Sequence, residues 1–512
     1  MNNYSKILIL DYGSQYTQLI ARRIRELNVY SEVIPHNSSL SKIKQKSFDG
    51  LILSGGPMSV YGKSSYKLNK NIFDFNIPIL GICYGMQLLI QNFGGKVEPS
   101  KIREFGHMNI RILNSDLLFD GVKDETAVWM SHGDKIISFD KEWSPIAYSD
   151  NNVLAAIKHK RNEYYGVQFH PEVIHTVEGD KILSNFLFKI ANCKPSWTPQ
   201  NFIKDALNNI KNKVGDKNVI CGISGGVDSS VMGALINKAV KGQAKFVFVN
   251  HGLLRKNEEV EVMSSLKDGL GMDIECIDAS KIFLDSLKGV EDPEQKRKII
   301  GKLFVDTFDE VSKNIEGIEF LAQGTLYPDV IESGGSDNSV TIKSHHNVGG
   351  LPDKLNFELI EPLRDLFKDE VREVGKELAI PDFLIDRHPF PGPGLAVRII
   401  GEITQTRIDM LKEADDIFIK TLVDKGEYNN IWQAFAVLIP IKTVGVMGDG
   451  RTYENLIALR AVTSKDGMTA DWYRMPESVL QMVSNKIINE VKGVNRVVYD
   501  ITSKPPGTIE WE

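Results

Sequence analysis

Short apolar runs alternate with amphipathic stretches along the first 190 residues of the chain. The runs at residues 6–10, 50–53, 77–82 and 164–169 are short and almost wholly apolar, as buried strands are. Helix-competent segments separate them. This alternation is typical of a parallel sheet with helices on its faces, so we predict a parallel α/β domain here.

A second α/β pattern begins near residue 201. Residues 192–199 contain two prolines and no periodicity, which predicts a linker. The sequence His-Pro-Phe-Pro-Gly-Pro-Gly at 388–394 predicts a rigid, turn-rich junction, beyond which helix and strand patterns mix. The predicted fold class is α/β, with two successive parallel-sheet α/β domains and a C-terminal α+β domain. The predicted bounds are 1–193, 194–200 for the linker, 201–387 and 388–512.

A glycine-rich loop follows an expected strand at 219–223 and precedes a helix-competent run at 231–236. The loop consists of Ser224, Gly225, Gly226, Val227, Asp228, Ser229 and Ser230. Adjacent glycines allow backbone N–H groups to close around an anion. We expect Ser229 and Ser230 to cap the helix, whose N-terminus adds positive potential.

The loop lacks the Gly-Lys-Ser/Thr ending of a Walker loop, which argues against a kinase or GTPase. An ordinary strand-to-helix turn is the alternative interpretation. Because Ser-Gly-Gly-x-Asp-Ser after a buried strand is uncommon, the sequence favours an anion-binding loop over a plain turn.

Cys83 has the setting of a nucleophile. Gly81 and Gly85 flank it at the spacing of a nucleophile elbow, between an expected strand and a helix. A helix N-terminus behind a thiol favours the reactive thiolate. A lone cysteine is usually a buried structural residue, but the paired glycines favour the nucleophile.

The nucleophile needs a base and a site for the developing oxyanion. His170, at the end of an expected strand, can exchange the thiol proton, and Glu172 can orient it. His175 is the alternative base. The N–H groups of Gly56 and Tyr84 could form an oxyanion hole, although Gly55-Gly56-Pro57 is equally consistent with a plain turn.

Composition limits the partners. Of the 512 residues, 42% are apolar and 25% are charged, as in soluble globular proteins. A net charge of −6 argues against a broad nucleic-acid or anionic-membrane surface, and no apolar run approaches the length of a membrane span. Four cysteines match no disulfide scaffold or zinc motif, and the first residues lack the pattern of a signal peptide. We therefore expect a cytoplasmic protein that binds neither nucleic acid nor membrane.

Together these motifs resemble a known family. Cys83, His170 and Glu172 in their contexts resemble the triad of class I glutamine amidotransferases, and the loop from Ser224 resembles the pyrophosphatase loop of adenylating enzymes. In this order they resemble the glutamine-hydrolysing GMP synthetases. The resemblance covers the whole chain and includes motifs at 11–15, 130–134, 251–255, 343–350 and 503–512. One position departs from it, since Asn250 stands where an acid is expected before His251.

The resemblance implies two half-reactions. Cys83 would hydrolyse glutamine and release ammonia. ATP would adenylylate xanthosine 5′-monophosphate (XMP), and ammonia would displace AMP to give GMP. The loop from Ser224 would hold the pyrophosphate of ATP, the strand ending at Val249 would face the adenine, and Asp228 would hold Mg²⁺. A helix N-cap is the alternative role for Asp228.

The resemblance also implies an acceptor site, a lid and a homodimer formed through the third domain. XMP would contact Gln433, Lys504, Ile509 and Glu510, on a tail that we expect to be docked rather than disordered. The lid residues would be Lys343, His345 and His346, within a Gly- and Ser-rich stretch at 333–350. The two histidines are equally consistent with solvated loop residues, and Arg364 and Lys368 with either a site or a helix surface.

Two rival functions remain open at this point. One is another pyrophosphatase-loop enzyme, such as an amide-forming NAD or asparagine synthetase, against which the 503–512 motif argues. The other is a glutamine- or nucleotide-sensing protein without catalysis, against which the intact triad and loop argue.

Overall fold

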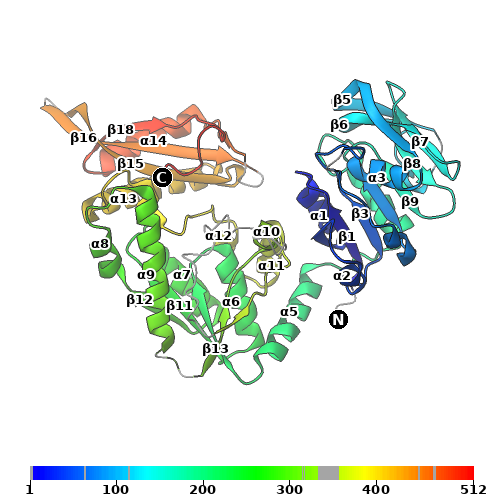
Figure 1. The fold of residues 1–512 in the computed structure, drawn as a ribbon. Helices are drawn as coiled ribbons and strands as arrows, with labels where there is room; N and C mark the ends of the chain where they lie inside the picture. Colours follow the sequence, from blue (N-terminus) through cyan, green and yellow to red (C-terminus); the bar gives the residue numbers. More distant parts are fainter. Residues whose placement is uncertain are drawn as a thin grey trace. The chain divides into compact units, whose positions relative to one another are not determined.

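The structure is a computed structural model that describes residues 4–62, 65–113, 116–313, 315, 317–332, 357–447, 450–464 and 469–512. The chain forms two compact units (Figure 1). The first is built mainly from residues up to Phe202, and the second from Ile203 to Asp329 and from the later part of the chain to Glu512.

The first unit contains a nine-stranded sheet in the order β2-β1-β3-β4-β9-β8-β7-β5-β6, drawn in blue to cyan in Figure 1. Its strands are β1 Lys6–Asp11, β2 Tyr30–Pro35, β3 Gly50–Leu53, β4 Ile79–Ile82, β5 Lys96–Ile112, β6 Glu125–Ser138, β7 Trp143–Ser149, β8 Leu154–His159 and β9 Tyr164–Val167. Its helices are α1 Thr17–Glu26, α2 Leu40–Lys44, α3 Tyr84–Asn92 and α4 Gly179–Asn185.

The predicted parallel strands are confirmed in β1, β3, β4 and β9. Together with β2 they form a parallel half-sheet, and β3 and β4 are buried along their whole length. Burial on both faces explains their continuous apolar runs. The sheet continues through four antiparallel strands that the apolar runs did not indicate. Of these, β6 alternates buried and partly exposed residues along its first half, because one of its faces meets solvent.

Glycines create the tight crossing of α3 over the sheet. A Cβ at Gly85 would lie 2.2 Å from the carbonyl oxygen of Leu53, and one at Gly81 would lie 2.6 Å from the carbonyl carbon of Gly85. Both distances are too short for a side chain. The two glycines therefore allow α3 to start directly against β3 and β4.

The second unit contains a five-stranded parallel sheet in the order β12-β11-β10-β13-β14. Its strands are β10 Asn218–Ile223, β11 Ala244–Asn250, β12 Ile274–Asp278, β13 Ile318–Ala322 and β14 Glu358–Ile360. The helices of this part are α5 Pro199–Val214, α6 Val227–Ala239, α7 Glu258–Met263, α8 Ser280–Leu287, α9 Pro293–Lys313, α10 Tyr327–Glu332, α11 Lys368–Glu377 and α12 Asp382–Ile385. The loop from Ser224 thus follows the central strand, at the carboxyl edge where α/β sheets bind ligands.

The C-terminal part adds a four-stranded sheet to this unit. It contains β15 Gln433–Met447, β16 Gly450–Thr463, β17 Asp471–Trp472 and β18 Val494–Tyr499, with helices α13 Gln405–Asp424 and α14 Glu477–Glu490. A single hydrophobic cluster runs from Val247 on β11 through Leu395 to Leu438 on β15. The two parts therefore share one core, and the predicted boundary at 387/388 stays a prediction.

Across the residues that the structure describes, every helix is too short or too polar to span a bilayer.

Candidate active sites

Cys83 is the single residue between β4 and α3. It has φ 52° and ψ −106°, a conformation that side chains rarely adopt, and it is 6% exposed. Its Sγ lies 3.5 Å from Nε2 of Gln168 and 3.8 Å from the carbonyl oxygen of Ser131. Strain of this kind occurs at functional sites, where the surrounding fold maintains it.

His170 connects the thiol to a carboxylate. Its Nδ1 lies 2.7 Å from Oε1 of Glu172, and its side chain interacts with that of Cys83. Burial opposes the charged imidazole, but the Glu172 carboxylate and the Cys83 contact outweigh it, so the pKa of His170 is raised well above its usual value. His175, the alternative base, instead packs against Trp129.

The glycine turn after β3 lies beside these residues. A Cβ at Gly55 would be 3.2 Å from Cε1 of His170, and one at Gly56 would be 3.3 Å from the ring of Tyr84. The glycine turn therefore lies beside the imidazole of His170 and the side chain of Tyr84, the residue that follows Cys83. The oxyanion hole from the N–H groups of Gly56 and Tyr84 stays a prediction.

In the second unit, the loop from Ser224 is closed by its own hydroxyls. Ser224 N–H donates to Oγ of Ser229 at 3.2 Å, while Ser229 and Ser230 both donate to the carbonyl oxygen of Gly226. Gly225 has φ +74°, and a Cβ there would lie 2.6 Å from Cγ2 of Val262, so glycine is required.

The capping prediction for this loop is wrong. Gly226 is the N-cap residue, without a side-chain cap, because α6 begins at Val227. Ser229, Ser230 and Asp228 therefore lie within the helix, where the serine hydroxyls bond back to a carbonyl. The same geometry removes the N-cap alternative for Asp228.

Asp228 has one paired and one unpaired carboxylate oxygen. Its Oδ2 forms an ion pair with Lys368, whereas its buried Oδ1 has no hydrogen-bond partner. Lys368 therefore faces the loop, while Arg364 pairs with Glu361. Among the described residues, no group of three His, Cys, Asp or Glu side chains could hold a metal ion.

The next strand ends beside this loop. Val249 is buried near the end of β11. The amide of Asn250 donates to Glu259 at 2.6 Å and accepts from Gly252 N–H at 2.9 Å. At this position, where the family resemblance predicts an acid, the amide thus shapes the turn after the strand. The neighbouring His251 is buried, which lowers its pKa to about 4.

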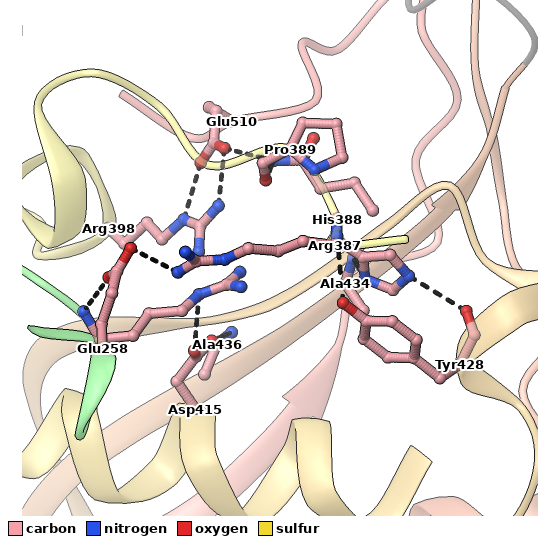
Figure 2. Close-up of polar contacts among 12 residues, drawn as sticks. Glu258, Arg387, His388, Pro389, Arg398, Asp415, Tyr428, Ala434, Ala436 and Glu510 are labelled. Atoms are coloured by element: carbon pink, nitrogen blue, oxygen red, sulfur yellow. Dashed lines mark hydrogen bonds and ion pairs between the residues drawn. The ribbon is translucent and has the colours of Figure 1, made fainter. Parts of the chain in front are cut away.

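Arginines that the sequence did not single out surround the ring of Phe390. Figure 2 shows two of them, Arg387 and Arg398, with their carboxylate partners Glu258 and Glu510. Arg387 donates to the carbonyl oxygen of Gly225 at 3.2 Å and pairs with Glu258. Arg255 pairs with Asp415 at 3.3 Å. The only signal in the sequence was the position of Arg387 directly before the turn-rich junction. Its contact with Gly225, 162 residues away along the chain, could be found only from the tertiary structure.

The structure pairs two of the four predicted acceptor residues directly and places the other two next to Ala470. Gln433 Nε2 donates to Oε1 of Glu510 at 2.7 Å, and Ile509 is buried in the cluster that contains Ala470. Lys504 pairs through its backbone with Ala470. The expected docked tail is therefore confirmed. The predicted lid residues Lys343, His345 and His346 lie outside the described residues.

Comparison with known families shows which class of enzyme carries this geometry. Residues 8–190 match the family of class I glutamine amidotransferases, residues 200–300 match NAD synthase, and residues 420–511 match the GMP synthase C-terminal domain. The first unit is therefore a class I glutamine amidotransferase domain.

Relatives that match over the full length of the chain identify the family more narrowly. The chain is 56% identical to the glutamine-hydrolysing GMP synthase of Brachyspira hyodysenteriae over 512 residues, which cover 100% of both chains. The Aquifex aeolicus and Bacillus subtilis enzymes of the same name are each 52% identical over 506 residues, 99% of this chain and 99% and 98% of theirs. The chain belongs to the glutamine-hydrolysing GMP synthase family. It is a ligase with a glutamine amidotransferase domain, as the sequence predicted.

Replacing Glu172 by glutamine tests the buried pair. We expect the pKa of His170 to fall, because the carboxylate no longer stabilises the imidazolium, and the glutaminase rate to drop about 10²–10⁴-fold. The stability that the pair contributes is present below the ordinary histidine pKa of about 6.5. It is lost as the pH rises through the raised folded-state value.

NMR titration of His170 and glutaminase assays measure these effects. Glu178→Gln is the matched control, because Glu178 pairs with Lys181 at the surface. An unchanged His170 titration in Glu172→Gln would contradict the assignment.

Proposed function

We propose that this protein makes GMP from XMP, ATP and glutamine, with its two active sites divided between the two units. The observation that carries the proposal is the arrangement of Cys83, Gln168, His170 and Glu172 around a strained elbow. A chain with this group in one unit, and a glycine loop and docked tail in the other, suits an enzyme that releases ammonia at one site and uses it at another.

The glutaminase half-reaction uses the thiol and the His170–Glu172 pair. The Cys83 sulfur attacks the side-chain amide carbon of glutamine, and His170 accepts the thiol proton. The N–H groups of Gly56 and Tyr84 donate to the oxyanion that forms. His170 then protonates the departing ammonia, and water hydrolyses the thioester to glutamate and free thiol.

The synthetase half-reaction takes place at the loop from Ser224. The backbone N–H groups of Gly225 and Gly226 and the start of α6 present positive potential to the pyrophosphate of ATP. The C2 oxygen of XMP attacks the α-phosphorus, and pyrophosphate leaves. Ammonia then adds at C2 and AMP departs, leaving GMP. Val249 at the strand edge is proposed to face the adenine.

The residues at this loop fit Mg²⁺ as the ion that accompanies ATP. Asp228 has a buried oxygen without a partner, and Mg²⁺ in nucleotide sites commonly takes one or two carboxylates plus phosphates and water. The absence of a three-ligand protein cage among the described residues agrees with that pattern. When bound, the ion would neutralise phosphate charge, and Asp228 would hold it.

The tail is proposed to bind XMP. Lys504 would meet the phosphate, while Gln433, Ile509 and Glu510 would meet the ribose and base. The hydrogen bond between Gln433 and Glu510 and the burial of Ile509 support one shared site. A phosphate monoester strongly prefers a cationic partner, and Lys504 supplies one.

A homodimer through the C-terminal sheet accounts for its exposed apolar side chains. Val444 and Tyr453 are cross-strand partners on β15 and β16, and Val446 follows two residues after Val444. Their exposed fractions are 51%, 58% and 74%. Clustered apolar exposure of this kind marks interaction surfaces. We also propose a cytoplasmic location, since all four cysteines are unpaired.

Replacing Cys83 by alanine should abolish GMP formation from glutamine but leave formation from ammonia intact, because the thiol acts only in releasing ammonia. Steady-state assays with each nitrogen source measure this. Cys193→Ala is the control, since burial raises the pKa of that thiol to about 12 and leaves it unreactive. Normal glutaminase turnover in Cys83→Ala would refute the assignment.

Replacing Lys504 by alanine should weaken XMP binding by about 1.5–3 kcal/mol, the contribution of a hydrogen bond to a charged group. ATP affinity should change little, because the Ser224 loop holds its phosphates. Equilibrium binding of both nucleotides is the measurement, with the exposed Lys492→Ala as the control. An equal loss for both nucleotides would remove Lys504 from the acceptor site.

Replacing Val446 by aspartate should convert the dimer to a monomer, because a charge cannot be buried at an apolar interface without a partner. Sedimentation analysis measures the mass. Val260→Asp, at a valine that is 68% exposed on α7, is the matched control and should leave the dimer intact. A wild-type protein that sediments as a monomer would reject the proposal outright.

A further inference from the structure

Three cations in the second unit have fully buried side chains, and each of them holds a different stretch of the tail at residues 500–512. They are Arg460 on β16, Arg398 in the short helix Gly394–Arg398, and Lys296 on α9. Among the residues that the structure describes, no other lysine or arginine is fully buried. A buried cation is stable only with good partners, and for all three cations the tail supplies some of those partners.

Arg460 closes the loop that carries Lys504. Its guanidinium donates to the carbonyl oxygen of Thr502 at 2.5 Å and to that of Thr508 at 3.1 Å, on either side of Lys504. The same guanidinium pairs with Asp500 at 3.2 Å. A single buried side chain therefore holds both ends of the segment from Thr502 to Thr508.

Arg398 holds the carboxylate of Glu510 with two parallel hydrogen bonds. Its Nε lies 3.1 Å from Oε2 and its Nη2 lies 2.9 Å from Oε1 (Figure 2). The guanidinium carbon lies over the Phe435 ring, 4.1 Å from its centre. This cation–π contact adds to the stability of the buried arginine. Two-point pairing fixes the direction of the carboxylate as well as its position.

Lys296 anchors the end of the tail to the ATP-binding part of the unit. Its ammonium donates to the carbonyl oxygens of Ala396 and Ile399, at 3.3 and 2.8 Å, and pairs with Glu512. Gly401 N–H donates to the other oxygen of Glu512 at 3.2 Å. Figure 1 shows the end of the chain near α9, which agrees with this contact.

We propose that Lys296, Arg398 and Arg460 are positioning residues for the acceptor nucleotide. They keep Lys504 and Glu510 in place and act only through the tail. The proposal rests on the proposed XMP site, which those two residues form. Because Lys296 lies on α9, it also makes the position of the tail depend on the part of the unit that binds ATP.

Lys296→Met tests the proposal, since methionine keeps much of the length of lysine and removes its charge. In the ammonia-driven reaction we expect KM for XMP to rise about tenfold, as for the loss of one charged contact. We expect KM for ATP and kcat at saturating XMP to stay within about twofold. Lys302→Met, at an exposed lysine on the same helix, is the control and should change none of these values.

Glu512→Gln is the second variant, and it decides the matter if Lys296→Met does not fold. It leaves Lys296 bonded to the carbonyl oxygens of Ala396 and Ile399 and removes only the negative charge of the Glu512 side chain. The same selective rise in KM for XMP is expected. An unchanged KM for XMP, or equal changes for XMP and ATP accompanied by a lowered unfolding temperature, would overturn the proposal in favour of a merely structural role.

The proposed function and the positioning role can be refuted independently. A wild-type protein that forms no GMP from XMP, ATP and ammonia would refute the proposed function. A wild-type protein that forms GMP, with Lys504→Ala raising KM for XMP and Lys296→Met leaving it unchanged, would refute the positioning role alone.

Discussion

The cost of burying charge is the constraint on which the second unit depends. A buried cation without a partner is strongly destabilising, so each arginine around Phe390 needs a carboxylate. These carboxylates come from distant segments: Glu258 for Arg387, Asp415 for Arg255 and Glu510 for Arg398. The pairs connect the start of α7, the middle of α13 and the tail around one aromatic ring.

This constraint links the two proposed nucleotide sites within one compact unit. Arg387 contacts the Gly225 carbonyl of the proposed ATP loop, while Arg398 contacts Glu510 of the proposed acceptor tail, and both pack against Phe390. The hydrophobic cluster that runs from β11 to β15 supports the same arrangement. Transfer of an adenylyl group between two bound nucleotides needs such fixed geometry, because a small misplacement of reacting groups costs rate.

The first unit depends instead on backbone strain. Cys83 is held at positive φ because α3 presses directly against β3 and β4, and the missing side chains of Gly81 and Gly85 permit that contact. The strained turn sets the thiol against Gln168 and His170. Glu172, which is fully buried, stabilises the charge on His170. Packing of the sheet and helix therefore prepares the chemistry of the site.

The sequence by itself determined the features that depend on local order. Apolar runs predicted β1, β3 and β10 because burial on both faces leaves no polar positions, and glycine spacing predicted the turns at Cys83 and Gly225. It misplaced the cap of α6, since hydroxyls within a helix can bond backwards to a carbonyl. Only the tertiary structure decided the partners of Arg387, Arg398 and Lys296. A buried charge is satisfied by whatever group the fold brings within hydrogen-bonding distance, and for Lys296 that group lies 216 residues away along the chain.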